Sequence, residues 1–321
     1  MTRRRISNTM PGELSHNERN IVSDVVREYD SDFRVKAGSV ADVSLVTPEA
    51  GVIVLNELDG LLYFADQYGW NQGGRKSPIQ LFVKYTDTQF AFRFMAPIGK
   101  TLDIYDGDGT MTQKAGNDST PVTHNTTYAE AGTYTFYVLG DVLDITWIRL
   151  NNQSMISGSI NGYSLLLNLV DLLASSTGLY GNISNLNNLP LSSIILSNSD
   201  VTGSVEDLVS LVSLVSLTIP GTDVVGDVSA VMGGMTLLQY YYAETTDVEF
   251  NSVITISSAI SVFSSHDCNW TTTMVDNCLI SLANGTVTGA TITLGGNNAP
   301  RSPASDAAFA QLDAANTLTV N

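Results

Sequence analysis

Apolar residues recur at a fixed interval through the second half of the chain, from about residue 158 to 268. Pairs of apolar residues three positions apart advance by an almost constant step of a little over twenty residues per copy. They are Leu169 and Leu172, Leu191 and Ile194, Leu214 and Leu217, Leu237 and Tyr240, and Ile260 and Phe263. A glycine followed two residues later by Ile or Val recurs in step, at Gly158, Gly181, Gly203 and Gly226. Two independent markers in phase predict a solenoid of stacked units.

Each copy reads as a short extended segment, a turn and a looser return, most clearly in residues 191–205. This pattern resembles the leucine-rich repeat, and the resemblance covers about residues 145–295. In that family a small polar residue ends each strand and hydrogen-bonds to the turn. The resemblance gives this role to Thr177, Ser199, Thr222, Thr245 and Cys268. Residues 202–205, Thr-Gly-Ser-Val, are similar to the Gly-x-Ile variant of the family, which implies an extended return strand.

The last part of the chain predicts a cap, because the apolar end of a stack of repeats has to be covered. Residues 271–282 have a helical pattern, and residues 290–294 read as a strand. Ser302 followed by Pro303 predicts the start of a second helix, because this pair suits the N-cap and the first turn. A final strand is expected after it.

Between about residues 78 and 150 the apolar alternation changes to period two, which predicts strands over residues 79–85 and 90–94. A turn-rich hairpin follows over residues 104–110, and an extended strand over residues 128–138. Together they resemble the PKD-like (polycystic-kidney-disease-type) β-sandwich, although residue 106 is Asp where that family has an aromatic side chain. The resemblance implies a module that binds or spaces and does not catalyse.

Residues 1–14 lack apolar periodicity and contain three adjacent arginines, Arg3, Arg4 and Arg5. A helix is expected from Ser15, where Glu18 completes a capping box, and a second helix over Pro48–Tyr68. We therefore expect a mainly β protein in three parts. These are an N-terminal helical arm and anchor (residues 1–75), a small PKD- or Ig-like β-sandwich (76–144), and a leucine-rich-repeat solenoid with a C-terminal cap (145–321).

The charge of the chain is strongly and unevenly negative. Its formal net charge is −17 at pH 7, and residues 151–321 contain thirteen acidic side chains against one basic residue, Arg301. Such a surface repels nucleic acid and anionic membranes, so neither is expected as a partner. The three arginines of the arm either dock on an acidic partner or are simply solvated. No apolar run follows them to form a secretory signal, and no apolar segment of about 18 residues exists to insert into a membrane.

The sequence offers no constellation typical of an active site, and no enzyme activity, cofactor or metal is expected. His266-Asp267-Cys268 has the residue types of a thiol catalyst, but Cys268 occupies an inward position and no second base is near in sequence. The acidic hairpin Asp103–Asp108 could hold calcium, but it lacks the spacing and the distal Glu of a helix-loop-helix site, so hairpin turn chemistry is the preferred interpretation. The two cysteines are expected to be free, buried thiols.

One face of the predicted solenoid sheet is low in charge. The residues between the inward-facing pairs line up from copy to copy and are small, neutral and partly apolar, whereas solvated strands usually carry charges there. Such a face suits contact with a protein or a glycan, unless another copy of the chain or the preceding domain covers it. The residues expected to carry this contact are Leu173, Ile195, Thr218, Gln239, Tyr241 and His266.

These features favour a non-enzymatic structural protein of a phage virion, such as a head fibre, a capsid decoration or a tail-associated protein. The order of modules and the turn at residues 298–300 resemble surface and phage proteins of Bacteroidetes bacteria, and a missing export signal fits assembly in the host cytoplasm. The arm would bind other virion proteins, and the solenoid of a homo-oligomer would contact a protein or glycan of the host surface. The alternative is a bacterial cell-surface leucine-rich-repeat adhesin.

Overall fold

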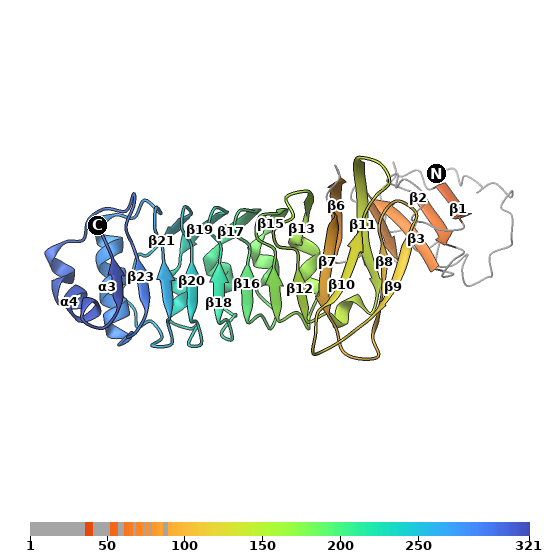
Figure 1. Ribbon diagram of the computed structural model, residues 1–321. Helices are drawn as coiled ribbons and strands as arrows, with labels where there is room; N and C mark the ends of the chain where they lie inside the picture. Colours follow the sequence, from red (N-terminus) through yellow and green to blue (C-terminus); the bar gives the residue numbers. More distant parts are fainter. Residues whose placement is uncertain are drawn as a thin grey trace, which may run out of the picture. The chain divides into compact units, whose positions relative to one another are not determined.

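Strands predominate in the molecule (Figure 1), which confirms the expected mainly β class. The structure is a computed structural model that describes residues 36–40, 52–56, 61–66, 69–72, 75–76, 79–85 and 89–321. The chain forms two compact units, Met1–Ser77 and Pro78–Asn321. In the described part of the chain, no helix is long and apolar enough to cross a lipid bilayer.

The described part of the first unit is a five-stranded sheet in chain order, with β1 and β2 parallel and the later pairs antiparallel. Its strands are β1 (Lys36–Val40), β2 (Val52–Asn56), β3 (Leu61–Asp66), β4 (Gly69–Gln72) and β5 (Arg75–Lys76). The helix predicted over Pro48–Tyr68 is therefore wrong, because Val52–Val54 is a β-branched run that favours a strand. The helix predicted from Ser15 and the arginines at 3–5 lie outside the described residues.

The second unit begins with two facing β layers. One layer contains β6 (Gln80–Tyr85), β11 (Gly132–Gly140), β8 (Thr101–Tyr105) and β9 (Met111–Ala115), and the other contains β7 (Phe90–Met95) and β10 (Val122–Thr126). The strands predicted over residues 79–85 and 90–94 are thus confirmed. Phenylalanines fill the space between the layers, since the ring centroid of Phe136 lies 4.9 Å from that of Phe90 and 5.3 Å from that of Phe92. This apolar interior holds the layers face to face.

Both layers continue without a break into the solenoid. β13 (Ile156–Ser159) pairs antiparallel with β6, and β12 (Trp147–Arg149) pairs antiparallel with β7. Every later pair is parallel and joins one coil to the next. The two sheets have nine and ten strands, in the orders β21-β19-β17-β15-β13-β6-β11-β8-β9 and β10-β7-β12-β14-β16-β18-β20-β22-β23-β24. The domain boundary expected at 144/145 falls inside this one compact unit.

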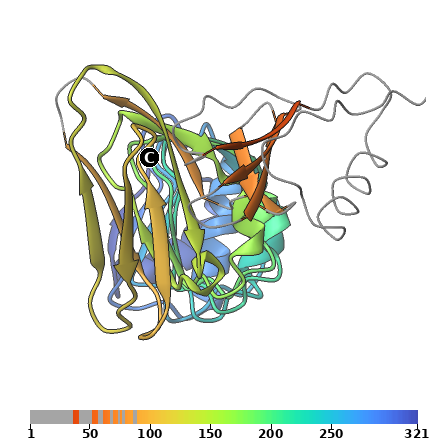
Figure 2. The same ribbon diagram turned by 90° about the vertical axis from the view of Figure 1, so that its right-hand side faces the viewer.

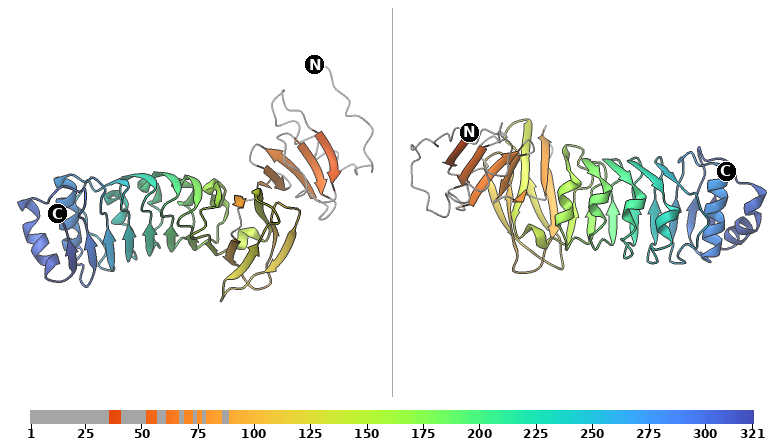
Figure 3. Two further views of the ribbon diagram at one scale, coloured as in Figure 1. Left: turned by 45° about the horizontal axis from the view of Figure 1, so that its top comes forward. Right: turned by 180° about the vertical axis from the view of Figure 1, so that it is seen from behind.

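Each coil runs through a strand of the ten-stranded sheet, a turn, a return strand of the nine-stranded sheet and a short helical segment (Figures 2 and 3). The first strands are β14 (Asp171–Leu173), β16 (Ser193–Ile195), β18 (Ser216–Thr218), β20 (Tyr240–Tyr242) and β22 (Val262–Ser264). The return strands are β15 (Gly178–Asn182), β17 (Asp200–Ser204), β19 (Asp223–Asp227) and β21 (Asp247–Glu249). The helical segments are η3 (Ile160–Leu165), η4 (Ile183–Leu186), η5 (Val205–Leu208) and α2 (Ser229–Met232). The predicted solenoid with extended return strands is therefore confirmed.

The fourth copy differs from its predicted register by one residue. Leu237 and Tyr240 were expected to face the core, but these side chains are 52% and 41% exposed, and Leu238 and Tyr241 are buried instead. The step from Leu217 to its partner Tyr241 is one residue longer than the preceding step, from Ile194 to Leu217. The extra residue lies in α2, where an α-helical turn, with the Met232 N–H donating to Val228 O at 3.0 Å, replaces the tighter 3-10 turn of η5.

A hydroxyl closes the turn after the strand in each of four copies and a thiol takes that position in the fifth, as the resemblance to the leucine-rich repeat implied. In the first three copies the hydroxyl donates to the backbone carbonyl three residues earlier, and these donors are Thr177 (2.8 Å), Ser199 (2.6 Å) and Thr222 (2.7 Å). In the fourth copy the donor is Thr246, at 2.6 Å, and the prediction of Thr245 is wrong because of the register shift. Cys268 takes the fifth position, where its thiol donates to Ala243 O of the preceding copy at 3.0 Å.

The residue immediately before each of these side chains has a left-handed backbone. The position is held by Ser176 (φ 55°), Asn198 (φ 53°), Gly221 (φ 63°), Thr245 (φ 56°) and Asp267 (φ 58°). A left-handed conformation costs a non-glycine residue roughly 1–2 kcal/mol. Hydrogen bonds between coils offset this cost, as where the Ser176 N–H donates to Ser197 O at 2.7 Å and the Asn198 N–H donates to Pro220 O at 2.8 Å.

The C-terminal cap contains the predicted helices and strands. It is built from α3 (Thr272–Asn284), β23 (Thr291–Thr293), η6 (Pro303–Ser305), α4 (Asp306–Asp313) and β24 (Thr317–Thr319). Asp276 of α3 accepts hydrogen bonds from the Ser302 N–H at 2.9 Å and from the Ser302 and Ser305 hydroxyls at 2.5 Å each. Burial raises the pKa of Asp276, but these hydrogen bonds outweigh it, so the pKa lies below its ordinary value. This carboxylate ties the two helical parts of the cap together.

Candidate binding surface

The candidate site is the outer face of the ten-stranded sheet from β12 to β24, which we call the strand face. Because side chains alternate along a strand, the residues on either side of each buried central residue point outward. The pairing register aligns them into two rows. The first row is Trp147, Asp171, Ser193, Ser216, Tyr240, Val262, Thr291 and Thr317, and the second is Arg149, Leu173, Ile195, Thr218, Tyr242, Ser264, Thr293 and Thr319. Of these, Ser264 is covered and buried.

From β14 onward the two rows contain a single carboxylate, Asp171, whose pKa is raised by burial. The other residues are Ser, Thr, Tyr and aliphatic side chains, which hydrogen-bond weakly or pack. Carboxylates occupy the other sheet instead, since Asp200, Asp223 and Asp247 are exposed at the start of the return strands. The negative charge of these coils therefore lies mainly away from the strand face.

Three of the six predicted contact residues lie side by side in the second row, as expected. Leu173 pairs with Ile195, and Ile195 with Thr218, and all three are partly exposed. Gln239 lies immediately before β20 and is also partly exposed, but it stands outside the two rows. His266 lies two residues beyond β22, at the turn. The structure thus brings together the first three residues and leaves Gln239 and His266 at the margin.

The prediction that Tyr241 lies on the strand face is wrong. Its side chain is fully buried, and its ring centroid lies 4.9 Å from that of Phe263. Tyr240 and Tyr242 take the outward positions because of the register shift. Burial raises the pKa of Tyr241 well above its ordinary value. Within the described residues, neither its hydroxyl nor that of Ser265 makes a hydrogen bond of normal geometry.

The residues with catalytic character do not assemble into a site. Cys268 is buried, and burial raises the pKa of its thiol, which disfavours the thiolate that a nucleophile needs. The His266 ring pairs with Asp267 instead, with Nδ1 2.7 Å from Oδ2, and it is the backbone carbonyl of His266 that lies near the thiol, at 3.7 Å. Cys278 is a second free, buried thiol, so both cysteines are as predicted.

The acidic hairpin Asp103–Asp108 uses its central carboxylate within the sandwich. Asp106 is buried with Oδ1 2.8 Å from His124 Nε2, and it accepts hydrogen bonds from the hydroxyls of Thr126 at 2.5 Å and Thr110 at 3.2 Å. In the described residues no group of three or more His, Cys, Asp or Glu side chains is placed to hold a metal ion. This geometry favours the hairpin interpretation over calcium binding.

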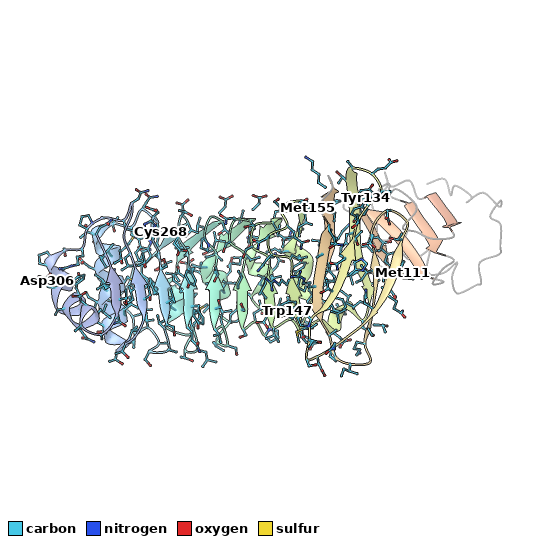
Figure 4. All side chains as sticks on the ribbon, viewed as in Figure 1. Met111, Tyr134, Trp147, Met155, Cys268 and Asp306 are labelled. Atoms are coloured by element: carbon cyan, nitrogen blue, oxygen red, sulfur yellow. The ribbon has the colours of Figure 1, made fainter. Side chains whose placement is uncertain are left out.

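The first strand of the face was missed by sequence reasoning. Trp147 of β12, which Figure 4 labels, continues the first row. Arg149 continues the second row, and Met95 and Arg93 of β7 stand directly opposite Trp147 and Arg149. Trp147 precedes its partner Asp171 by about one repeat length, so the repeat spacing could have found it. The repeat spacing does not reach the two β7 residues, because they belong to an antiparallel strand of the sandwich; the period-two alternation of that strand gives only their side of the sheet.

No protein-family model matches the chain, and no curated protein matches it. Among solved structures it is similar to internalin C2 from Listeria monocytogenes, with 14% identity and a TM-score of 0.36 over 57% of this chain and 84% of that one. It is similar to the BIR2 ectodomain from Arabidopsis thaliana, with 22% identity and a TM-score of 0.30 over 50% and 72%. It is also similar to the LRR ectodomain of the plant membrane receptor kinase GASSHO1/SCHENGEN3 from Arabidopsis thaliana, with 19% identity and a TM-score of 0.35 over 44% and 17%.

In each case only part of this chain is similar to the solved structure. The chain spans less than a third of the length of GASSHO1/SCHENGEN3 and of the HAESA receptor kinase. The class of the protein follows instead from its own coils. Parallel strands in register, a hydroxyl after each strand and a left-handed residue in each turn define a leucine-rich-repeat-like solenoid. Repeat folds of this kind present extended surfaces and bind through them.

Proposed function

We propose that the chain is a non-enzymatic binding protein that contacts a protein or a surface glycan through the strand face. The observation that carries this proposal is the contrast in charge between the two sheets of the solenoid. Thirteen acidic side chains and one basic side chain lie in residues 151–321, yet the two rows from β14 onward contain Asp171 alone. Depletion of charge over a continuous, half-exposed surface is typical of the centre of an interface.

The proposed setting is a phage virion, as a head fibre, a capsid decoration or a tail-associated protein. The support is the sequence order, in which a module that resembles a PKD-like sandwich precedes the repeats. The arginines at positions 3–5 would bind other virion proteins, the sandwich would act as a spacer, and the solenoid of a homo-oligomer would meet the host surface. Mass spectrometry of purified particles tests this setting. Recovery of the protein from cell envelopes, with none in particles, would replace it with a cell-surface adhesin.

The binding role of the strand face is tested by site-specific photo-crosslinking in the native source. A photoreactive amino acid is placed at Thr218, in the second row, and in a matched variant at Thr202, which is exposed on the nine-stranded sheet. We expect a discrete covalent adduct from the Thr218 variant and none from the Thr202 variant. Equal labelling from both positions, or labelling from Thr202 alone, would remove the strand face as the contact surface.

A further inference from the structure

Two arginines stand directly opposite each other where the solenoid meets the sandwich. Arg93 of β7 and Arg149 of β12 are paired in the antiparallel register, and both side chains are exposed. Their chain neighbours Phe94 and Ile148 are fully buried, so both guanidiniums lie on the outer side of the sheet. Like charges directly opposite each other in an antiparallel pair are destabilising. The repulsion between the two guanidiniums would be offset if an anion were bound between them.

Within residues 79–85 and 89–321, neither arginine makes an ion pair or a hydrogen bond through its side chain. Two other cations of the same unit are paired, since Lys100 Nζ lies 2.9 Å from Asp144 Oδ2 and Arg301 bonds to Asp306, whereas in these residues Lys84 and Lys114 stand alone and not opposite a like charge. The nearest carboxylate in the rows is Asp171, which stands opposite Trp147 and not opposite Arg149. In the described part of this acidic chain, two adjacent guanidiniums thus remain available to an external anion.

The surroundings of the arginine pair are those of a protein interface. Trp147 and Met95 stand opposite each other on the same face, next to the pair, and Leu173 flanks Arg149 on the solenoid side. Trp, Met and Arg are the residue types enriched at the buried centres of protein interfaces, and Trp and Arg dominate their binding energy.

The strands that carry the pair are held in a fixed position. Gln153, in the turn after β12, bonds to both backbone groups of Ala91 in β7, because its Nε2 donates to Ala91 O and its Oε1 accepts from the Ala91 N–H, each at 2.7 Å. The two strands are therefore tied by a side-chain amide as well as by their own pairing. Preorganised donors lower the ordering cost of binding.

We propose that Arg93, Arg149, Trp147 and Met95 form a binding site for an acidic segment of a partner protein. A Glu or Asp side chain of the segment lies between the two guanidiniums, and an adjacent apolar side chain packs on Trp147 and Met95. Guanidinium groups bind carboxylates through paired, charge-assisted hydrogen bonds. The acidic sheet on the other side of the solenoid repels such a segment, which confines it to this end of the strand face. This inference rests on the proposed function and adds the chemistry of the partner.

The test measures binding of a short fluorescein-labelled peptide of alternating Glu and Leu to the full chain by fluorescence anisotropy. A Gln and Leu peptide and a short oligo-galacturonate are the comparison probes. The double variant Arg93→Gln/Arg149→Gln is compared with Lys84→Gln/Lys114→Gln, which removes the same charge from the exposed Lys84 and the partly exposed Lys114 on the other sheet. We expect the arginine variant to bind the Glu peptide at least about tenfold more weakly, and the lysine variant to bind it nearly as the parent does. The Gln peptide should not bind.

Four outcomes would overturn the proposal. Equal weakening by both variants would show an unspecific charge effect, and binding of the galacturonate without the Glu peptide would make the site a glycan site. Self-association of the parent chain that Arg93→Gln/Arg149→Gln abolishes, measured by sedimentation, would make a second copy the occupant. Thermal melts of both variants show that they are folded. If photo-crosslinking at Thr218 gives an adduct but the Glu peptide does not bind, the proposed function of the strand face is kept. Only the proposal of an arginine site is then wrong.

Discussion

In the sandwich, His124 Nε2 lies 2.8 Å from Asp106 Oδ1, and the two side chains are only 5% and 4% exposed. Thr126 donates to the same carboxylate oxygen, and Tyr128 donates its hydroxyl to the backbone carbonyl of Asp106 at 2.9 Å. A polar network thus occupies the position where the resemblance to the PKD-like family implied an aromatic contact. Buried networks of this kind are stable only while every member keeps its partners.

Replacing one member of the buried pair of His124 and Asp106 should therefore lower the free energy of unfolding strongly. His124→Ala leaves the Asp106 carboxylate without its main partner and is expected to lower the free energy of unfolding by about 3 kcal/mol. The double variant His124→Ala/Asp106→Ala should lose clearly less than the sum of the two single variants, because the pair acts as a unit. Urea titration followed by circular dichroism measures all three. Strict additivity would mean that the two side chains do not depend on each other.

The register of the fourth copy can be tested at two adjacent threonines. Thr246→Val removes the hydroxyl that donates to Ala243 O and should cost about 1 kcal/mol. Thr245→Gly should be neutral or stabilising, because Thr245 is strained at φ 56° and its side chain is exposed. Urea midpoints of the two variants give the comparison. The reverse order of stability would restore the register predicted from the sequence.

The neighbouring tyrosines Tyr241 and Tyr242 should respond differently to truncation. Tyr241→Ala opens the core and is expected to cost about 3–5 kcal/mol, whereas Tyr242→Ala on the strand face should change the free energy of unfolding by less than about 0.5 kcal/mol. Tyr241→Phe should be neutral or slightly stabilising, because the buried hydroxyl lacks a well-formed hydrogen bond. Denaturation midpoints test the series, and a large loss in Tyr242→Ala would contradict the inward position of Tyr241.

The cap should loosen in acid because of Asp276. Its pKa lies below its ordinary value in the folded chain, so the unfolded chain takes up a proton at a higher pH than the folded one. The stabilisation is fully present above about pH 4, the ordinary range of an Asp pKa, and is lost as the pH falls below it. Hydrogen exchange of α3 and α4 at pH 7 and at about pH 3 measures this. Asp276→Asn should reduce the difference between the two conditions, while the exposed Asp313→Asn serves as its control.

Both thiols should resist reagents in the folded chain. Cys268 and Cys278 are buried, and burial raises the pKa of each. A chromogenic disulfide reagent near neutral pH should therefore titrate neither thiol until urea unfolds the protein. Rapid reaction of Cys268 in the native state would reopen the question of a thiol catalyst at His266-Asp267-Cys268.

The solenoid was predictable because its signal is local and repeated. Each coil contains its own apolar residues, its own turn and a polar side chain in that turn. The position of each element in one copy can therefore be checked against the other copies. The one error, at Tyr241, came from a single extra residue in the helical segment α2, which a fixed repeat spacing does not allow for. Because of this shift of one residue, Tyr241 faces the core where the outer face was predicted. For the same reason Thr246, and not Thr245, donates the hydrogen bond in the turn.

The arginine pair and the strands of the first unit were not predictable for a different reason. Arg93 and Arg149 are far apart in the sequence and meet only through antiparallel pairing of β7 with β12, for which no short-range pattern exists. In the region Pro48–Tyr68 the apolar spacing fitted a helix, yet the described residues form β2 and β3, because a β-branched run packs better in a sheet. Long-range pairing thus decided the first case, and the local preference of β-branched residues for a strand decided the second.

The antiparallel joins of β6 with β13 and of β7 with β12 have a mechanical consequence. Two continuous sheets cross the junction, so no flexible linker separates the sandwich from the solenoid. The sandwich and the solenoid therefore cannot rotate independently of each other. A force applied to the coils would act on the backbone hydrogen bonds of both sheets at once. It would reach the sandwich as a shear force between neighbouring strands. Residues 79–85 and 89–321 are thus suited to act as one stiff body.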